Sequence, residues 1–174
     1  MTVTVAKFLD VANGIQPKQF SIGDRYQVSS ISELDETYKQ LMDKPFACTM
    51  AVMGGSGRAN LTPMWFDYEG DKVLINVAEH RKKTQWIRKN PEVSILIMNP
   101  ENMYHWMSMK VTVVREISED DPNEGRRVTD QLNKIWKKYT GDAGDYALRD
   151  PSINERRVLL ECRVDSIATF GQPA

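Results

Sequence analysis

The spacing of hydrophobic and polar positions changes along the chain, and these changes mark the predicted helices and strands. Apolar side chains first recur at helical spacing at Leu34, Tyr38, Leu41 and Met42. Ser30 and Glu33 have capping-box spacing at the start of this predicted helix. We expect the helix to end at Lys44-Pro45, because the residue before a proline is disfavoured in the helical conformation.

The same patterns predict two further helices and six strands. A second helix is predicted over residues 80–89, and a third is predicted to be capped by Asp121. The apolar stripe of the third helix consists of Val128, Leu132, Ile135, Trp136 and Tyr139. Apolar or alternating runs predict strands over residues 46–53, 60–67, 72–78, 93–98, 103–117 and 157–168. Because short turns join most of these strands, we expect a mainly β (β/α) fold, an antiparallel sheet closed on itself with helices outside.

The domain organisation predicted from these elements is simple. The 174 residues suit one domain with a single core. Residues 1–29 show no sustained period, and we expect an extension that wraps the domain or a partner subunit; a disordered tail is an equal alternative for part of it. Residues 30–174 are expected to form the folded domain.

Composition and charge narrow the classes of function. The 23 Lys and Arg residues nearly balance the 24 Asp and Glu residues, which argues against nucleic-acid or anionic-membrane partners and makes any anion site local. No apolar run approaches the roughly 20 residues of a membrane span, and the N-terminus is too short and polar for a secretory signal. Cys48 and Cys162 match no metal or redox spacing. We therefore expect buried thiols in a reducing cytoplasm.

Three cations stand where the second predicted helix begins: Arg81, Lys82 and Lys83, followed by Thr84. The positive end of the helix dipole disfavours cations by roughly 0.3–1 kcal/mol each. The arrangement becomes favourable when backbone N–H groups, these cations and the Thr84 hydroxyl hold a phosphate. A solvated basic turn is the alternative interpretation.

Two other segments suggest a pocket for a planar ligand. Leu61-Thr62-Pro63-Met64 lies in a predicted strand, where Pro63 removes a ladder donor; this favours either a site where a ligand meets the backbone or a protected edge strand. In the run from Met103 to Met107, Tyr104 and Trp106 share one strand face. They are substrate-pocket candidates, with ordinary core or a dimer interface as the alternative.

No motif for side-chain or metal catalysis is present. The chain has no P-loop ending, Rossmann glycine pattern, HExxH, CxxC or nucleophile elbow. We therefore assign no catalytic acid or base and no metal site. A bound organic cofactor is then the natural source of any chemistry.

Three segments of the chain resemble a known family. Leu61-Thr62-Pro63-Met64-Trp65-Phe66-Asp67-Tyr68-Glu69-Gly70-Asp71 resembles the Pro-x-Trp-Phe strand and hairpin of the pyridoxamine 5′-phosphate oxidase-like split-barrel superfamily. The segment from Arg81 to Ser94 resembles the Lys-Thr-x-x-(Ile/Leu)-Arg-x-(Asp/Asn)-Pro-x-(Val/Ala)-Ser run of the same superfamily. The segment from Glu155 to Leu160 resembles the closing strand of its flavin/deazaflavin oxidoreductase branch. Trp86 departs from the pattern, because many relatives have Asn there.

The resemblance implies a six-stranded split β-barrel that forms a homodimer, with cofactors in clefts between the subunits. It implies that Arg81, Lys82, Lys83 and Thr84 bind the cofactor phosphate. It also implies that main-chain groups of Leu61, Thr62, Pro63 and Met64 face the ring.

The expected activity is hydride transfer from reduced coenzyme F420 or FMN to a small electrophilic or unsaturated molecule, and the branch resemblance favours F420. Pyridoxamine phosphate oxidase activity itself is not expected, because the substrate-binding residues of that enzyme are not found. Two alternatives remain open. One is a non-catalytic FMN or haem carrier, with His105 as the candidate axial ligand. The other is a structural dimer with an empty cleft.

Overall fold

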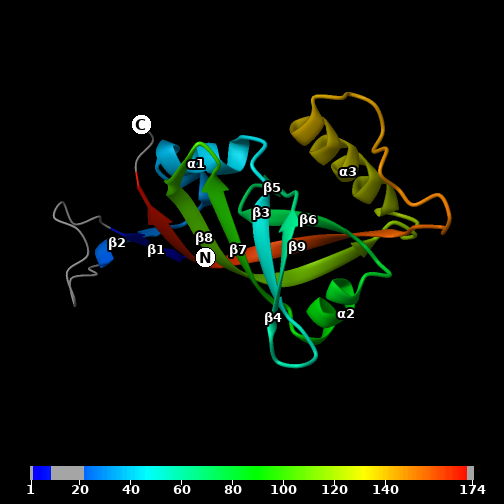
Figure 1. The fold of residues 1–174 in the computed structure, drawn as a ribbon, viewed down its shortest axis with the longest axis horizontal. Coiled ribbons are helices and arrows are strands. Elements are labelled where there is room, and N and C mark those ends of the chain that lie inside the picture. The colour runs from blue at the N-terminus through cyan, green and yellow to red at the C-terminus, as the bar shows by residue number, and fades with distance from the viewer. Residues whose placement is uncertain (1, 9–21, 172–174) are drawn as a thin grey trace.

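The computed structural model describes residues 2–8 and 22–171, and these form a mostly β structure with three α-helices (Figure 1). The helices are α1 (Glu36–Asp43), α2 (Lys82–Lys89) and α3 (Gly125–Thr140), and a short 3-10 turn, η1 (Ile31–Glu33), precedes α1. The strands are β1 (Val3–Phe8), β2 (Ile22–Val28), β3 (Cys48–Met53), β4 (Ala59–Met64), β5 (Asp67–Glu69), β6 (Lys72–Ala78), β7 (Glu92–Asn99), β8 (Asn102–Ser118) and β9 (Arg157–Phe170). The predicted mainly β fold with flanking helices is confirmed.

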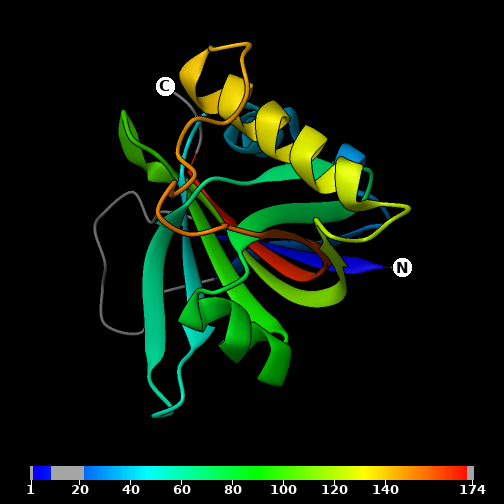
Figure 2. The same ribbon diagram turned by 90° about the vertical axis from the view of Figure 1, so that its right-hand side faces the viewer.

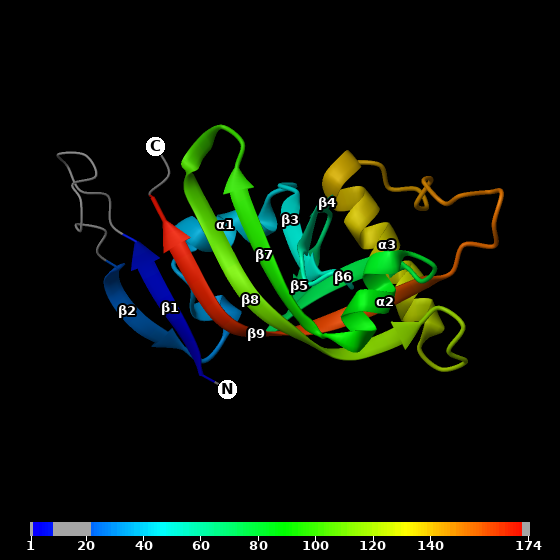
Figure 3. The same ribbon diagram turned by 60° about the horizontal axis from the view of Figure 1, so that its bottom comes forward.

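One curled sheet contains all nine of these strands. Its main path runs β2-β1-β9-β8-β7-β3-β4, as Figure 3 shows for the first five strands. The long strand β9 has two partners along its second edge: its first half, residues 157–163, pairs with β6, and residues 166–170 pair in parallel with β1. Within the described residues β4 pairs with β3 only, so the sheet remains open between β4 and β5.

The strands β3, β4, β6, β7, β8 and β9 correspond to the six that the sequence predicts. The three additional strands lie in two places along the chain. Residues 67–69 form the short strand β5, which turns into β6 at Gly70, where the positive φ of 56° favours glycine. The segment predicted to be an extension supplies β1 and β2, which continue the sheet beyond β9. Its residues 9–21 lie outside the described part of the chain.

The core lies inside the curl of the sheet, where the inward positions of the alternating strands meet. In β7 the buried positions alternate with exposed or half-buried ones along most of the strand, as one covered sheet face requires. The largest side chains with less than 2% exposure are Tyr38, Leu41, Met42, Met50, Phe66, Ile75, Ile95, Ile97, Met107, Met109, Leu132 and Leu159. Burying about a dozen large apolar groups supplies the main driving force for folding.

The three helices cover different parts of the sheet (Figure 2). Helix α1 packs on β7 and β8, α2 packs on β3, and α3 packs on β6, β8 and β9. On α3 the predicted stripe faces inward, because Val128, Leu132 and Ile135 are all buried. Helix α3 therefore lies beside β6, the strand that leads into α2.

The predicted starts of two helices are wrong by several residues. Ser30 caps only the 3-10 turn, by accepting a hydrogen bond from the Ser32 amide, and Asp35 caps α1 instead. Asp121 accepts hydrogen bonds from the amides of Asn123 and Glu124, but these belong to a turn that precedes α3. In both places a polar side chain caps the nearest turn, and the helix begins after it.

Close backbone contact at the start of α3 gives a stability prediction. A Cβ atom at position 125 would lie 2.2 Å from the Glu119 carbonyl oxygen. We therefore expect Gly125→Ala to destabilise the protein by about 1–3 kcal/mol, as overpacking does, although alanine favours a helix by roughly 1 kcal/mol. Thermal unfolding measures the change. The matched control is Gly55→Ala, whose Cβ would meet its nearest atom at 3.9 Å; equal stability losses in the two variants would refute the expectation.

Candidate functional site

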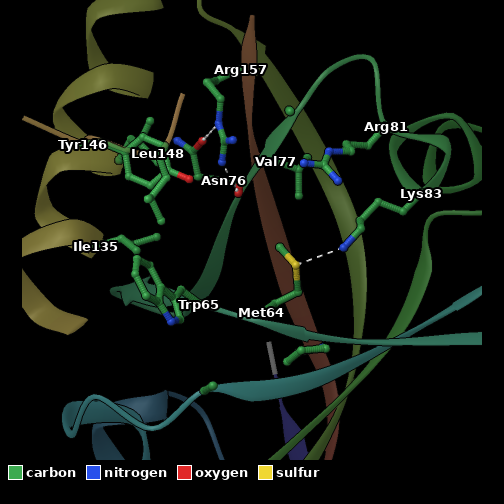
Figure 4. A pocket seen from close by; sticks show the side chains of 14 residues that line it. Met64, Trp65, Asn76, Val77, Arg81, Lys83, Ile135, Tyr146, Leu148 and Arg157 are labelled. Carbon is green, nitrogen blue, oxygen red and sulfur yellow. Dashed lines mark hydrogen bonds between the residues drawn. The ribbon is translucent and has the colours of Figure 1, made fainter. Parts of the chain in front are cut away.

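A cavity of about 400 Å³ opens between β4, the end of β6, the start of α2 and the inner side of α3 (Figure 4). Its volume lies within the usual range for small-molecule sites, roughly 300–1,000 Å³. The residues that line it are Ala47, Pro63, Met64, Trp65, Asn76, Val77, Ala78, Arg81, Lys83, Leu132, Ile135, Tyr146, Leu148 and Arg157. This lining contains no carboxylate, and three of its side chains are cationic.

The basic side of the cavity brings together the two segments that the sequence singled out. Lys83, in the first turn of α2, extends its ammonium group to β4, where it donates to Thr62 Oγ1 at 2.9 Å and contacts Met64 Sδ at 3.1 Å. Arg81 stands at the N-cap of α2 and lines the same cavity. Within the described part of the chain, neither Arg81 nor Lys83 forms an ion pair within 4.0 Å, although local hydrogen bonds and, to a smaller extent, the Arg81 charge lower the pKa of the exposed Asp150 carboxyl.

The surroundings of Lys83 disfavour its positive charge, as the direction of its pKa shift shows. Burial lowers the pKa of the Lys83 ammonium, and the nearby Arg81 charge lowers it further. Both effects disfavour the protonated form. A bound anion would oppose both effects, since its charge favours the ammonium and offsets the repulsion from Arg81.

The first turn of α2 has the donors that a phosphate requires. Arg81 makes no side-chain cap, and the Lys82 and Lys83 amides have no acceptor among the described residues, as expected in the first turn of a helix. The helix also has no acidic residue in its first turn. Free amides, two cations and the positive end of the helix dipole together fit a phosphate group.

Three of the other residues predicted to contact the cofactor do not line this cavity. Thr84 is fully buried and donates its hydroxyl to the Ala78 carbonyl oxygen, so its side chain braces the β6–α2 turn and does not face the cavity. Lys82 lines a neighbouring open groove on the other side of the helix start. The Leu61 side chain is 64% exposed and is not part of the cavity lining.

An aromatic wall closes the cavity opposite the cations, and sequence reasoning missed most of it. Trp65 stacks on Tyr139 with ring centroids 4.9 Å apart, and it also contacts Trp136 at 6.1 Å. Tyr146 meets Trp136 edge-on, and the Tyr146 amide donates to Asn133 Oδ1. These contacts hold the loop after α3 against the cavity mouth. The helical stripe was a usable signal for Trp136 and Tyr139, whereas Tyr146 lies in a loop without any period.

The buried side chain of Arg157 also lines the cavity, together with Asn76. No sequence pattern indicated this role. Arg157, the first residue of β9, donates to Asn76 Oδ1 at 2.9 Å and to the Asn76 carbonyl oxygen at 3.0 Å. It also donates to Glu155 Oε1 at 2.9 Å. Figure 4 shows Arg157 and Asn76 between the aromatic side and the basic side.

The two substrate-pocket candidates lie elsewhere in the chain. Tyr104 and Trp106 occupy the start of β8, where both rings contact Phe170 at the end of β9. Tyr104 is 71% exposed, and neither ring lines the cavity. The shared strand face that the sequence predicts is therefore present, but a single chain does not bring it to the basic site.

The structure corrects the interpretation of His105 as an accessible haem ligand. Its side chain is 2% exposed and packs under α1. The Thr37 carbonyl oxygen lies 2.8 Å from Nε2, so Nε2 carries the proton, and Nδ1 accepts from Asn99. Both ring nitrogens are engaged, because the alternation along β8 directs His105 into the core.

The described residues give no alternative centre for catalysis by a metal. They contain no cluster of three or more His, Cys, Asp or Glu side chains that would hold an ion. Among the helices described, none has the length and apolar character needed to cross a membrane.

Comparison with known proteins identifies relatives of this fold. Residues 34–171 match the pyridoxamine 5′-phosphate oxidase family. A structure described as an F420 reductase is similar, with a TM-score of 0.60 and 21% identity over 77% of this chain and 98% of that chain. The haem storage protein HutZ from Vibrio cholerae has a TM-score of 0.55 and 13% identity over 77% of this chain and 92% of its own. General Stress Protein 26 from Bacillus anthracis has a TM-score of 0.54 and 17% identity, with 79% and 94% covered. At these identities the structural similarities show the fold alone.

Proposed function

This chain belongs to the pyridoxamine 5′-phosphate oxidase family, and from that premise we propose that its cavity binds the flavin-type coenzyme FMN or F420. We propose further that the protein is an oxidoreductase that acts on a small electrophilic or unsaturated molecule. F420 is the preferred cofactor in this proposal, in line with the branch that the sequence resembles.

The observation that carries the proposal is the unpaired positive charge at the start of α2. Arg81 and Lys83 line a cavity without a single carboxylate, next to the free amides of the first helical turn. A protein gains nothing in stability from cations at this end of a helix. Their position is explained when a phosphate binds there.

The chain's own residues would bind, orient and shield the ring. A flavin-type ring supplies hydride chemistry when it is bound. Lys83 and Arg81 would hold the phosphate, and Lys83 would keep β4 in place through Thr62. Pro63 and Met64 would lie beneath the ring, while Trp65 and Tyr146 would exclude water from its far side. Positioning of two rings is the main contribution expected of the protein.

We also propose a homodimer with the cofactor at the interface, located in the cytoplasm. The open edge of β4 and the exposed side chains Leu61 and Tyr104 are the surfaces available to a second subunit. In this arrangement Tyr104 and Trp106 would reach a cavity of the other subunit. Native mass spectrometry tests the dimer: a strictly monomeric protein that still binds cofactor at full affinity would contradict it.

A titration tests the cofactor proposal directly. Purified protein is mixed with FMN, F420 or haemin, and binding is followed by fluorescence quenching or by absorbance. We expect saturable binding of one flavin-type coenzyme, and consumption of the reduced coenzyme with an added electrophile. Binding of haemin with a Soret band, without flavin or deazaflavin binding, would favour the carrier alternative. Failure to bind any of the three would refute both and favour an empty structural dimer.

The lowered pKa of Lys83 gives a pH dependence with a definite sign. In the free protein Lys83 loses its proton at a pH below the ordinary lysine value, about 10.4. A bound phosphate favours the ammonium, so binding takes up a proton once the pH exceeds that lowered pKa. We therefore expect the dissociation constant to rise with pH by up to about tenfold per pH unit.

Titrations between pH 7 and pH 10.5 measure this dependence. The control is Lys83→Arg, which keeps its charge over the whole interval, so that only the pH dependence of the ligand itself should remain. A wild-type profile with the same shape as that of the control would contradict the assignment of Lys83 to the phosphate.

A further inference from the structure

The side chain of Arg157 has more hydrogen-bond donors than the protein uses. It is 9% exposed, and its guanidinium makes three hydrogen bonds, two to Asn76 and one to Glu155. An arginine carries five N–H donors. Two N–H groups of Arg157 therefore have no acceptor among the described residues. The side chain that carries them lines the cavity.

The surroundings hold this guanidinium in one orientation. Asn76 accepts through both its side-chain and main-chain oxygens, and the Asn76 amide group itself donates to the Val128 carbonyl oxygen and to Gln131 on α3. Tyr146 lies over the guanidinium, with 5.3 Å between Cζ and the ring centroid. Arg157 is therefore fixed from both sides and does not rely on solvent to orient it.

The two remaining N–H groups belong to a side chain that lines the cavity, where a bound ligand can reach them. Hydrogen bonds from a charged donor are stronger than those from a neutral one. Glu155 compensates the charge of Arg157 but not the two remaining donors. The cavity offers no carboxylate that could accept from them. An acceptor supplied by a ligand would complete the set, and the rigid fork of arginine favours a carbonyl or carboxylate oxygen.

We propose that Arg157 binds a carbonyl oxygen of the planar ring that occupies the cavity, on the α3 side, while Lys83 and Arg81 hold the phosphate on the α2 side. This inference rests on the proposed function and adds a second anchor to it. The two anchors recognise different parts of one molecule, because Arg157 contacts the ring and Lys83 the phosphate. Their contributions to affinity are therefore separable.

The test compares a cofactor with its phosphate-free counterpart: FMN with riboflavin, or F420 with its deazariboflavin core, whichever coenzyme the wild-type protein binds. We expect Arg157→Gln to weaken binding of both members of the pair by the same factor, about tenfold or more. We expect Lys83→Gln to weaken binding of the phosphorylated member only.

Loss of the fold is the main confounding effect, since Arg157→Gln leaves Glu155 as a buried unpaired charge. The double variant E155Q/R157Q removes both charges and should fold while showing the same loss of affinity. Arg157→Lys keeps the charge but not the fork, and should recover only part of the affinity. Unchanged affinity for the phosphate-free ligand in a folded E155Q/R157Q protein would overturn the inference, while the Lys83 effect would leave the phosphate site standing. A wild-type protein that binds neither ligand would overturn both.

Discussion

Replacing Lys83 by Glu is expected to weaken cofactor binding by about a hundredfold or more while the protein keeps its fold. The substitution removes the ammonium group that lies against Thr62 and puts a carboxylate into a cavity that has none. Removing one partner of a desolvated charge pair costs about 2–5 kcal/mol, and the added repulsion increases the loss. Isothermal titration with FMN and F420 measures the change, and circular dichroism checks the fold.

The matched control for this substitution lies on the same helix. Lys89→Glu makes the same change of charge at the exposed C-terminal end of α2, outside the cavity lining, and should leave the affinity within about twofold. A similar loss in both variants would mean that only the overall charge matters. An unchanged affinity in Lys83→Glu would remove the phosphate site from the start of α2.

Replacing Phe66 by Ala is expected to cost about 3–5 kcal/mol of unfolding free energy, the largest single-site stability loss that we expect. The ring is 0% exposed and belongs to the main core cluster. The Lys138 ammonium lies 4.8 Å from its centroid, so truncation leaves a void and removes the nearer of the two aromatic rings that contact this cation. Urea unfolding measures the change in free energy.

Two substitutions bracket this result. Phe66→Leu keeps most of the volume and should lose clearly less than Phe66→Ala. Val114→Ala truncates a side chain that is 47% exposed on β8 and should change stability by about 0.5 kcal/mol or less. A mild effect of Phe66→Ala would show that the corner between β4 and β5 repacks easily, contrary to its complete burial.

The fold was predictable because local patterns and turns determine most of it. Alternation along β7 and β8, and the hairpin signals between strands, give the strands to within a few residues. The strands β1 and β2 were not predicted, since β2 pairs with β1, and β1 joins the rest of the described sheet only by pairing with β9, more than a hundred residues away. Local propensity carries no information about such a pairing.

The basic half of the site was predictable for an electrostatic reason, and the remainder was not. Three cations in the first turn of a helix conflict with the helix dipole, so they stand out from sequence alone. Arg157 gives no such signal, because a charged residue before an apolar strand usually faces water. Its burial arises only when the loop with Tyr146 folds back over β6 and β9. Which face of β8 is inside also depends on α1, and for that reason His105 was misinterpreted.

The parallel pairing of β1 with the last residues of β9 has a practical meaning for anyone who shortens this protein. Residues 166–170 bond to β8 on one side and to β1 on the other. A chain trimmed to begin at residue 30 would leave that backbone row bare, beside the apolar side chain of Ile167. Exposed rows of this kind recruit other chains and promote aggregation. The N-terminal strands thus protect this edge, and the protein used in the binding experiments should retain them.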